Sequence, residues 1–95
     1  MEYKPNPVDL SDIDLSEDIK NDVERISMNI HETWAQQRIE RGWSYGSVYD
    51  SNTKKNPCLI EYDALPEKEK DMDRATVLQT IKMLLRLGYK IEKEK

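Results

Sequence analysis

Two stretches with helical periodicity flank a segment rich in turn-forming residues, and this arrangement constrains the fold more than any other feature of the sequence. Apolar side chains recur at steps of three and four in residues 16–41 and again in residues 66–87. Such spacing places them along one face of a helix. The predicted stripes consist of Ile19, Val23, Ile26 and Ile30, and of Ala75, Leu78, Ile81 and Leu85, widened by Val77 and Leu84. Because two stripes can bury each other, the sequence predicts a mostly α fold with two antiparallel amphipathic helices.

Both predicted helices carry start and stop signals where the periodicity places their ends. The hydroxyl of Ser16 can accept a hydrogen bond from a free amide of the first turn, and Gly42 can adopt the left-handed conformation that ends a helix. Pro66 suits the first position of the second helix, and Gly88 follows its last turn. An alternative is open in which the acidic residues near residue 71 break the second helix.

The remaining segments are expected to complete a single domain over residues 1–95, because a chain of this length has too little apolar surface for two cores. Residues 1–15 contain two prolines and a few apolar residues, which predicts an extended N-terminal arm. Residues 88–95 form a C-terminal tail in this scheme.

A long ordered loop is expected over residues 42–65, which combine turn-forming residues with several aromatic ones. The aromatic residues are too many for a flexible linker, so we expect them to lie on the helices. They are Trp43, Tyr45, Tyr49 and Tyr62. A short strand pair near Leu59 is left open by the apolar residues there.

The charge and the cysteine content narrow the classes of partner. Nineteen acidic and fifteen basic residues give a net charge of −4, with the acids concentrated near the N-terminus. Such a surface is a poor partner for nucleic acid. The sequence has no apolar run long enough for a membrane helix, and its one cysteine, Cys58, cannot form an internal disulfide. We therefore expect a cytoplasmic protein that contacts neither nucleic acid nor membrane.

No catalytic or metal-binding constellation can be assembled from the sequence. Residues 42–46 match the G-x-S-x-G pattern of the hydrolase nucleophile, but they follow a helix instead of a strand. His31 has no second histidine to complete a zinc site. A lone histidine beside an apolar stripe is usually a satisfied, half-buried side chain. We therefore expect no enzymatic activity, no cofactor and no metal.

Three groups of residues occur in an order that is specific to a known family. The groups are His31, Glu32, Trp34, Ala35, Arg38 and Ile39 with Gly42, Trp43, Tyr45, Gly46 and Asp50; then Pro57, Leu59, Tyr62, Leu65, Pro66, Glu69, Lys70 and Asp73; then Thr80, Lys82, Leu84, Leu85, Leu87, Gly88 and Tyr89. Together they resemble the ryanodine-receptor repeat (RyR) domain over residues 3–91, with departures at Asn56, Met72 and Arg86. The resemblance implies a compact α module without known enzymatic activity.

The first functional hypothesis is a binding module for a nucleotide-like small molecule. Its candidate site residues are Trp34, Arg38, Trp43 and Tyr45. An indole face stacks on a purine ring, and an arginine one helical turn from Trp34 can meet a phosphate. The resemblance adds that RyR domains have been proposed to sense nucleotides or related ligands.

Two alternatives are open to that hypothesis. Trp34 follows Ile30 by four residues, so it can simply continue the buried stripe, and Trp43 can then pack the loop onto it. The second functional hypothesis is a protein-interaction or scaffold domain that packs against a copy of itself or a partner chain, as the tandem copies of the family in calcium-release channels suggest.

Overall fold

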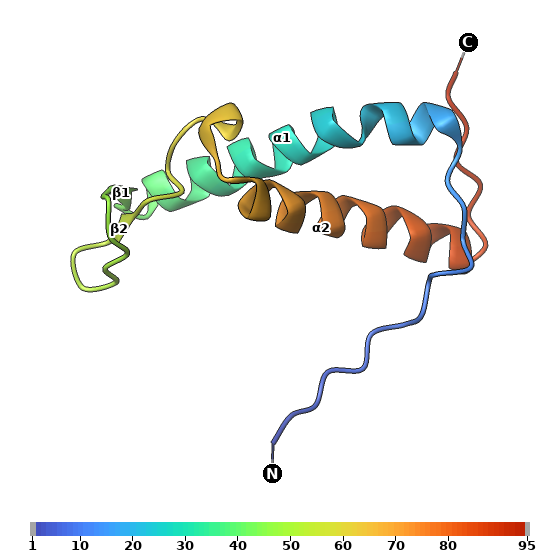
Figure 1. The fold of residues 1–95 in the computed structure, drawn as a ribbon, viewed down its shortest axis with the longest axis horizontal. Coiled ribbons are helices and arrows are strands. Elements are labelled where there is room, and N and C mark those ends of the chain that lie inside the picture. The colour runs from blue at the N-terminus through green and yellow to red at the C-terminus, as the bar shows by residue number, and fades with distance from the viewer. Residues whose placement is uncertain (1, 95) are drawn as a thin grey trace.

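The structure is a computed structural model that describes residues 2–94. Its elements are, in chain order, helix α1 (Glu17–Glu40), strands β1 (Ser44–Tyr45) and β2 (Lys55–Asn56), the 3-10 helix η1 (Tyr62–Ala64) and helix α2 (Glu67–Arg86). Figure 1 shows α1 running from the side of the C-terminus toward the strand pair, and α2 running back beside it. The predicted mostly helical fold is confirmed, and a short strand pair is present.

Helix α1 begins and ends through local hydrogen bonds that its sequence supplies. The Ile19 amide donates to the Ser16 hydroxyl oxygen at 3.3 Å, so Ser16 acts as the N-cap. At the other end, Gly42 has a φ of 92°, and the Trp43 amide donates to the Arg38 carbonyl at 3.0 Å. This left-handed glycine reverses the chain, and the residue after it is held against the last helical turn.

Helix α2 is continuous from Glu67 to Arg86, so the break considered near residue 71 does not occur. The guanidinium of Arg74 pairs with Glu67 at 3.0 Å and with Asp71 at 2.8 Å, which compensates the acids of the first turns. Pro66 also lies one position earlier than predicted. It is the N-cap, with extended backbone angles, and the helix starts after it.

The strand pair lies earlier in the loop than the segment near Leu59 where it was considered. β1 and β2 are parallel, with Ser44 beside Lys55 and Tyr45 beside Asn56. The segment between β1 and β2 turns back tightly because the Asp50 carboxylate accepts a hydrogen bond from the Asn52 amide at 2.9 Å.

Gly46 follows β1 at a point where the backbone passes close to β2. A Cβ added at this position would lie 2.6 Å from the Cβ of Lys55. We predict that Gly46→Ala lowers the free energy of unfolding by about 1–3 kcal/mol, because the strand pair must open to admit the methyl group. Urea denaturation followed by circular dichroism measures the loss, and an unchanged midpoint would show that the strands are not held this closely.

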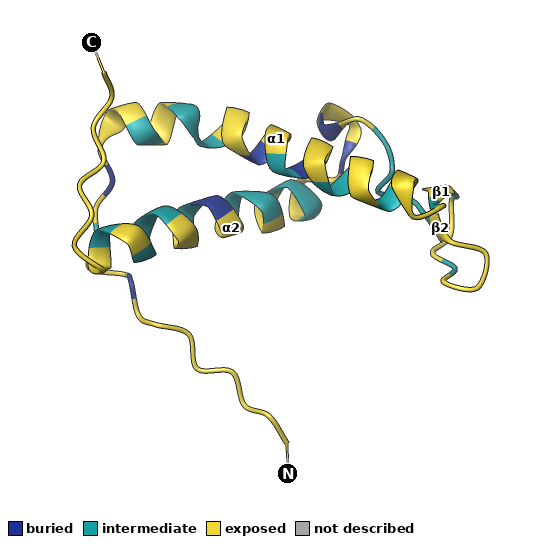
Figure 2. Cartoon of the chain, turned by 180° about the vertical axis from the view of Figure 1, so that it is seen from behind, coloured by how far each residue is buried: buried dark blue, intermediate teal, exposed yellow. Residues whose placement is uncertain are grey.

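The buried core is small and draws mainly on segments outside the two long helices. Its apolar members are Leu10, Leu15, Tyr62, Leu65 and Val77. Only one of these, Val77, belongs to a long helix, and Figure 2 shows how few dark buried positions the helices carry. The N-terminal arm and η1 therefore contribute as much to the core as the helices do.

The buried line of each long helix is rotated from the predicted stripe. In α1 the buried residues are Ser27 and His31, whereas Ile26 is 38% exposed. In α2 the buried residue is Val77, which was placed at the edge of the stripe, and Ala75 is exposed. Ser27 can be buried because its hydroxyl donates to the Val23 carbonyl at 2.8 Å, which satisfies the polar group internally.

Both terminal segments are attached to the helices by ion pairs. The Arg86 guanidinium pairs with the Asp12 carboxylate and also donates to the Asp9 carbonyl at 3.3 Å. The Lys93 ammonium pairs with Asp22 at 3.1 Å. Residues 2–9 extend away from the helices and are exposed (Figure 2). Within residues 2–94, no helix is both long enough and apolar enough to span a bilayer.

Candidate ligand-binding site

Aromatic rings and one arginine form a continuous row at the end of α1. The Trp34 ring stacks on the His31 ring with centroids 5.6 Å apart. The guanidinium carbon of Arg38 lies 5.9 Å from the Trp34 centroid and 5.5 Å from the Trp43 centroid, so it interacts with both indoles. The Tyr49 ring follows, 5.7 Å from Trp43. We call these five residues the aromatic row.

The local sequence explains how the row forms. His31, Trp34 and Arg38 are spaced by three and four residues, so they share one face of α1. The glycine turn at Gly42 then directs the chain back, and the hydrogen bond from Trp43 to the Arg38 carbonyl fixes the second indole near the arginine. The helix end therefore positions two indole rings around one guanidinium.

Three of the four predicted site residues are brought together and the fourth is not. Trp34, Arg38 and Trp43 are half-buried, so they are neither core residues nor freely exposed. Tyr45 is 55% exposed, and among the described residues its ring stacks on neither indole. Tyr49 takes the place next to Trp43 instead. No periodic signal could have identified Tyr49, because it is reached through an irregular turn.

The charge of Arg38 is not neutralised inside the described part of the chain. No ion pair or side-chain hydrogen bond joins its guanidinium to any residue from 2 to 94. By contrast, the guanidinium groups of Arg74 and Arg86 form ion pairs with carboxylates that are distant in the sequence. Arg38 is thus a cation held mainly by aromatic faces, and it can meet an anion without breaking an existing ion pair.

His31 links the aromatic row to the core. It is 4% exposed, and its Nε2 lies 2.7 Å from the Ile60 carbonyl oxygen, to which it donates. Its ring also lies 6.1 Å from that of Tyr62. These contacts agree with the expectation of a satisfied histidine, although the tertiary partners could not be identified from the sequence.

A polar cluster of Glu24, Tyr62 and Arg74 joins α1, η1 and α2. The Tyr62 hydroxyl donates to Glu24 at 2.8 Å, and Arg74 donates to the same carboxylate at 2.7 Å through Nε. The hydrogen bond from Arg74, and then that from Tyr62, lowers the pKa of Glu24 from 4.5 to about 2. Burial, followed by the hydrogen bond to Glu24, raises the pKa of the Tyr62 hydroxyl.

This cluster predicts a specific loss of stability in acid. Because the folded-state pKa of Glu24 is below its ordinary value, its contribution is complete above about pH 4.5 and is lost as the pH falls toward 2. We expect the difference in urea midpoint between the wild type and Glu24→Gln to be constant near neutral pH and to shrink below about pH 4. A difference that persists unchanged to about pH 2.5 would contradict the low pKa.

A cavity of about 250 Å³ opens beside Trp34, between α1, the loop and the start of α2. Its lining residues are His31, Trp34, Asn56, Cys58, Leu65, Glu69, Met72 and Asp73. Burial, and then the negative charges of Glu69 and Asp73, raises the pKa of the Cys58 thiol. The thiol therefore stays protonated near neutral pH and is a poor nucleophile.

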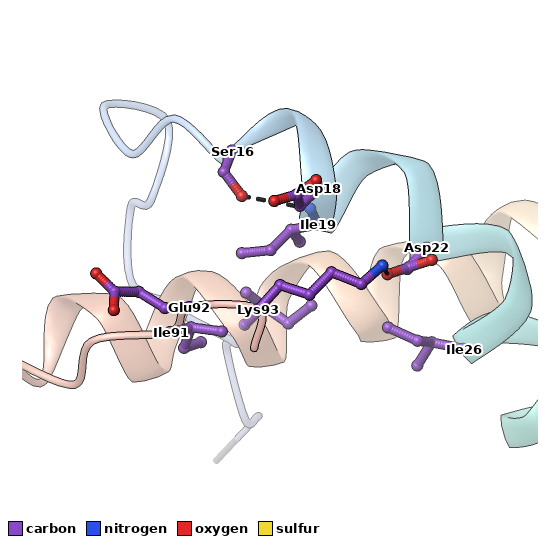
Figure 3. A pocket seen from close by; sticks show the side chains of 9 residues that line it. Ser16, Asp18, Ile19, Asp22, Ile26, Ile91, Glu92 and Lys93 are labelled. Atoms are coloured by element: carbon purple, nitrogen blue, oxygen red, sulfur yellow. Dashed lines mark hydrogen bonds and ion pairs between the residues drawn. The ribbon is translucent and has the colours of Figure 1, made fainter. Parts of the chain in front are cut away.

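A larger hollow of about 670 Å³ lies at the opposite end of the helices (Figure 3). Four of its nine lining residues are isoleucines, namely Ile19, Ile26, Ile81 and Ile91. Figure 3 shows the Lys93 side chain reaching along the hollow to the Asp22 carboxylate. Because no aromatic residue lines this hollow, it offers no stacking surface, and the cavity and the aromatic row remain the better candidates.

A family model described as RyR domain matches residues 3–93, which is nearly the whole chain. The match includes every residue of the aromatic row and of the neighbouring cavity.

Proposed function

Because the chain belongs to the RyR domain family, we propose that it is a non-enzymatic binding module that takes a nucleotide-like small molecule at Trp34, Arg38 and Trp43. The observation that supports this most directly is the guanidinium of Arg38 lying within 6 Å of both indole centroids. A planar cation beside two indole rings occupies the kind of space that a flat heterocycle also fits.

In the proposed complex, Arg38 is the side chain that moves to admit the ligand. A purine ring that enters beside Trp34 displaces the guanidinium from the indole, and stacking contributes about 1–3 kcal/mol by analogy with other aromatic platforms. The displaced Arg38 has no competing ion pair among residues 2–94, so it is available for a phosphate group. The two interactions together favour an aromatic ligand that carries an anion.

The same contacts support a binding role over catalysis. The one histidine already donates to the Ile60 carbonyl, and the pKa of the one thiol is raised. Neither group is therefore poised as a base or nucleophile. We further propose a cytoplasmic setting, which the unpaired thiol of Cys58 favours, and no nucleic-acid partner, which the net charge of −4 favours.

A thermal-shift titration with AMP and ATP tests the proposal. Wild-type protein should melt at a higher temperature with either nucleotide, because a ligand at about 100 times its Kd stabilises the folded state by about 2.7 kcal/mol. Trp34→Leu, which keeps an apolar side chain but removes the stacking face, should lose the shift. Tyr45→Leu is the matched control, since Tyr45 lies outside the aromatic row, and it should keep the shift. No shift of the wild type at millimolar nucleotide would refute the proposal.

A second candidate function is protein interaction, including packing against another copy of the chain. Large apolar side chains are exposed around the strand-pair end, with Val48 at 75% and Ile39 at 60%. Exposed apolar clusters of this kind often mark interfaces. Sedimentation velocity at several protein concentrations tests it, and a concentration-independent monomer would exclude self-association while leaving ligand binding untouched.

A further inference from the structure

The acidic residues at the start of α2 lie on two faces with different electrostatic surroundings. Glu67 and Asp71 are paired with Arg74. Glu69 and Asp73, which are also one helical turn apart, line the cavity beside Trp34. Neither of these two carboxylates forms an ion pair with any residue from 2 to 94. The helix thus neutralises one pair of acids and leaves the other pair facing a cavity.

Apart from Asn56, whose side-chain oxygen accepts a hydrogen bond from the Cys58 amide, the remaining walls of the cavity are aromatic, apolar or polarizable. Trp34 and His31 form one side, and Leu65, Met72 and Cys58 contribute apolar or polarizable surface. No lysine or arginine is among the eight lining residues. The nearby Lys70 is engaged elsewhere, because its ammonium lies 5.4 Å from the Tyr62 ring centroid and 3.6 Å from Glu67. The cavity therefore presents two carboxylates beside an indole, and His31 is the one basic side chain among its lining residues.

The electrostatic surroundings of Asp73 are consistent with a cavity that attracts positive charge. Burial, and then the neighbouring Glu69, raises the pKa of Asp73, while His31 acts in the opposite direction. A positive ligand would oppose both effects, because a nearby opposite charge stabilises the ionised carboxylate. His31 itself remains bonded to the Ile60 carbonyl through Nε2.

We propose that the cavity between α1 and α2 binds a small organic ammonium ion, with its charge between Glu69 and Asp73 and its alkyl part against Trp34 and Met72. Two carboxylates one turn apart can both accept hydrogen bonds from one ammonium group. Trp34 lines the same cavity and supplies apolar surface for the alkyl part. Trp34 is shared with the proposed nucleotide site, but Glu69 and Asp73 are not, so the two proposals are tested by different variants.

The walls favour an alkylammonium over the other cations that two carboxylates could attract. Calcium and magnesium need a nearly complete shell of oxygen ligands, whereas Trp34, Leu65 and Met72 supply none. Apolar walls instead favour a ligand with carbon attached to its charge. A volume of about 250 Å³ accommodates a small amine.

Titration of ¹⁵N-labelled protein with n-butylammonium, followed by NMR, tests the site. Amide resonances of residues around Trp34 and Asp73 should shift saturably with n-butylammonium, and 1-butanol, its neutral counterpart of similar shape, should leave them unmoved. Ammonium chloride should bind at least tenfold more weakly, because it lacks the alkyl part. Equal binding of ammonium and n-butylammonium, or no binding of n-butylammonium at about 50 mM, would overturn the proposal.

Paired variants separate the cavity from the rest of the helix. Glu69→Gln and Asp73→Asn should each weaken n-butylammonium binding by about tenfold, as expected for the loss of one charge-assisted hydrogen bond. Glu67→Gln, on the neutralised face of the same helix, should leave the affinity unchanged. Asp73→Asn should also melt no lower than the wild type, because it removes an unpaired charge, so loss of fold cannot imitate loss of the site.

A blocked lysine, acetylated and amidated at its backbone, separates a free amine from a protein side chain as the source of the ammonium group. Affinity within tenfold of that of n-butylammonium supports a small free amine as the occupant. Binding of blocked lysine more than tenfold tighter would assign the cavity to a partner's lysine and overturn the proposal.

Discussion

Replacing Tyr62 with alanine should lower the free energy of unfolding by about 3–5 kcal/mol, the range found for large aromatic side chains in protein cores. Tyr62 is 2% exposed, and its hydroxyl donates to Glu24. Among residues 2–94 the core has five buried apolar members, so few neighbours can compensate for the lost ring. Urea denaturation monitored by circular dichroism measures the change.

Tyr62→Phe is the matched control for that experiment. It keeps the ring and removes only the hydroxyl, so the expected loss is about 1 kcal/mol. Glu24 still has Arg74 as a partner in this variant. If Tyr62→Ala costs no more than Tyr62→Phe, the ring does not hold α1, η1 and α2 together, and the packing described above is wrong.

Replacing Arg38 with methionine should remove the advantage that a phosphate gives to a ligand at the proposed nucleotide site. We expect wild-type protein to bind AMP about 10- to 100-fold more tightly than adenosine, which is the range for a charge-assisted contact. In Arg38→Met the two ligands should bind almost equally, because methionine still fills the space between Trp34 and Trp43 but carries no charge. Isothermal titration calorimetry measures the four affinities.

Arg41→Met provides the control for general loss of positive charge. Arg41 lies at the same helix end, is exposed, and is outside the aromatic row. This variant should keep the preference for AMP. An equal loss of preference in both variants would show that the phosphate responds to the overall charge of this region and not to Arg38.

The elements that local sequence determines were predicted well. Ser16 and Gly42 bound α1 because capping depends on a few adjacent residues, and the family could be recognised from spaced motifs that the match over residues 3–93 confirms. The mostly helical class followed from periodicity alone. These features require no knowledge of which segments meet in space.

Features that depend on tertiary contacts were predicted less well. The buried line of α1 passes through Ser27 and His31, because an internal hydrogen bond and the Ile60 carbonyl satisfy their polar groups. Hydrophobicity alone cannot identify such positions. The strand pair was likewise displaced, since the turn at Asp50 decides which loop residues meet.

The candidate site shows the same division. Trp34 and Arg38 lie close together because of their helical spacing, which the sequence shows, and the glycine turn adds Trp43. Tyr49 and the cavity acids Glu69 and Asp73 were not connected to them, because α2 and the loop reach the site only through folding.

The most direct test of the central claim uses the two tryptophans of the chain as reporters. Their indole N–H groups give separate NMR signals, which Trp34→Leu and Trp43→Leu assign. During titration with AMP, both signals should shift along one saturable curve, because Arg38 leaves the space between the rings as the base enters. If neither indole signal moves at millimolar AMP while other resonances do, the nucleotide does not bind at Trp34, Arg38 and Trp43.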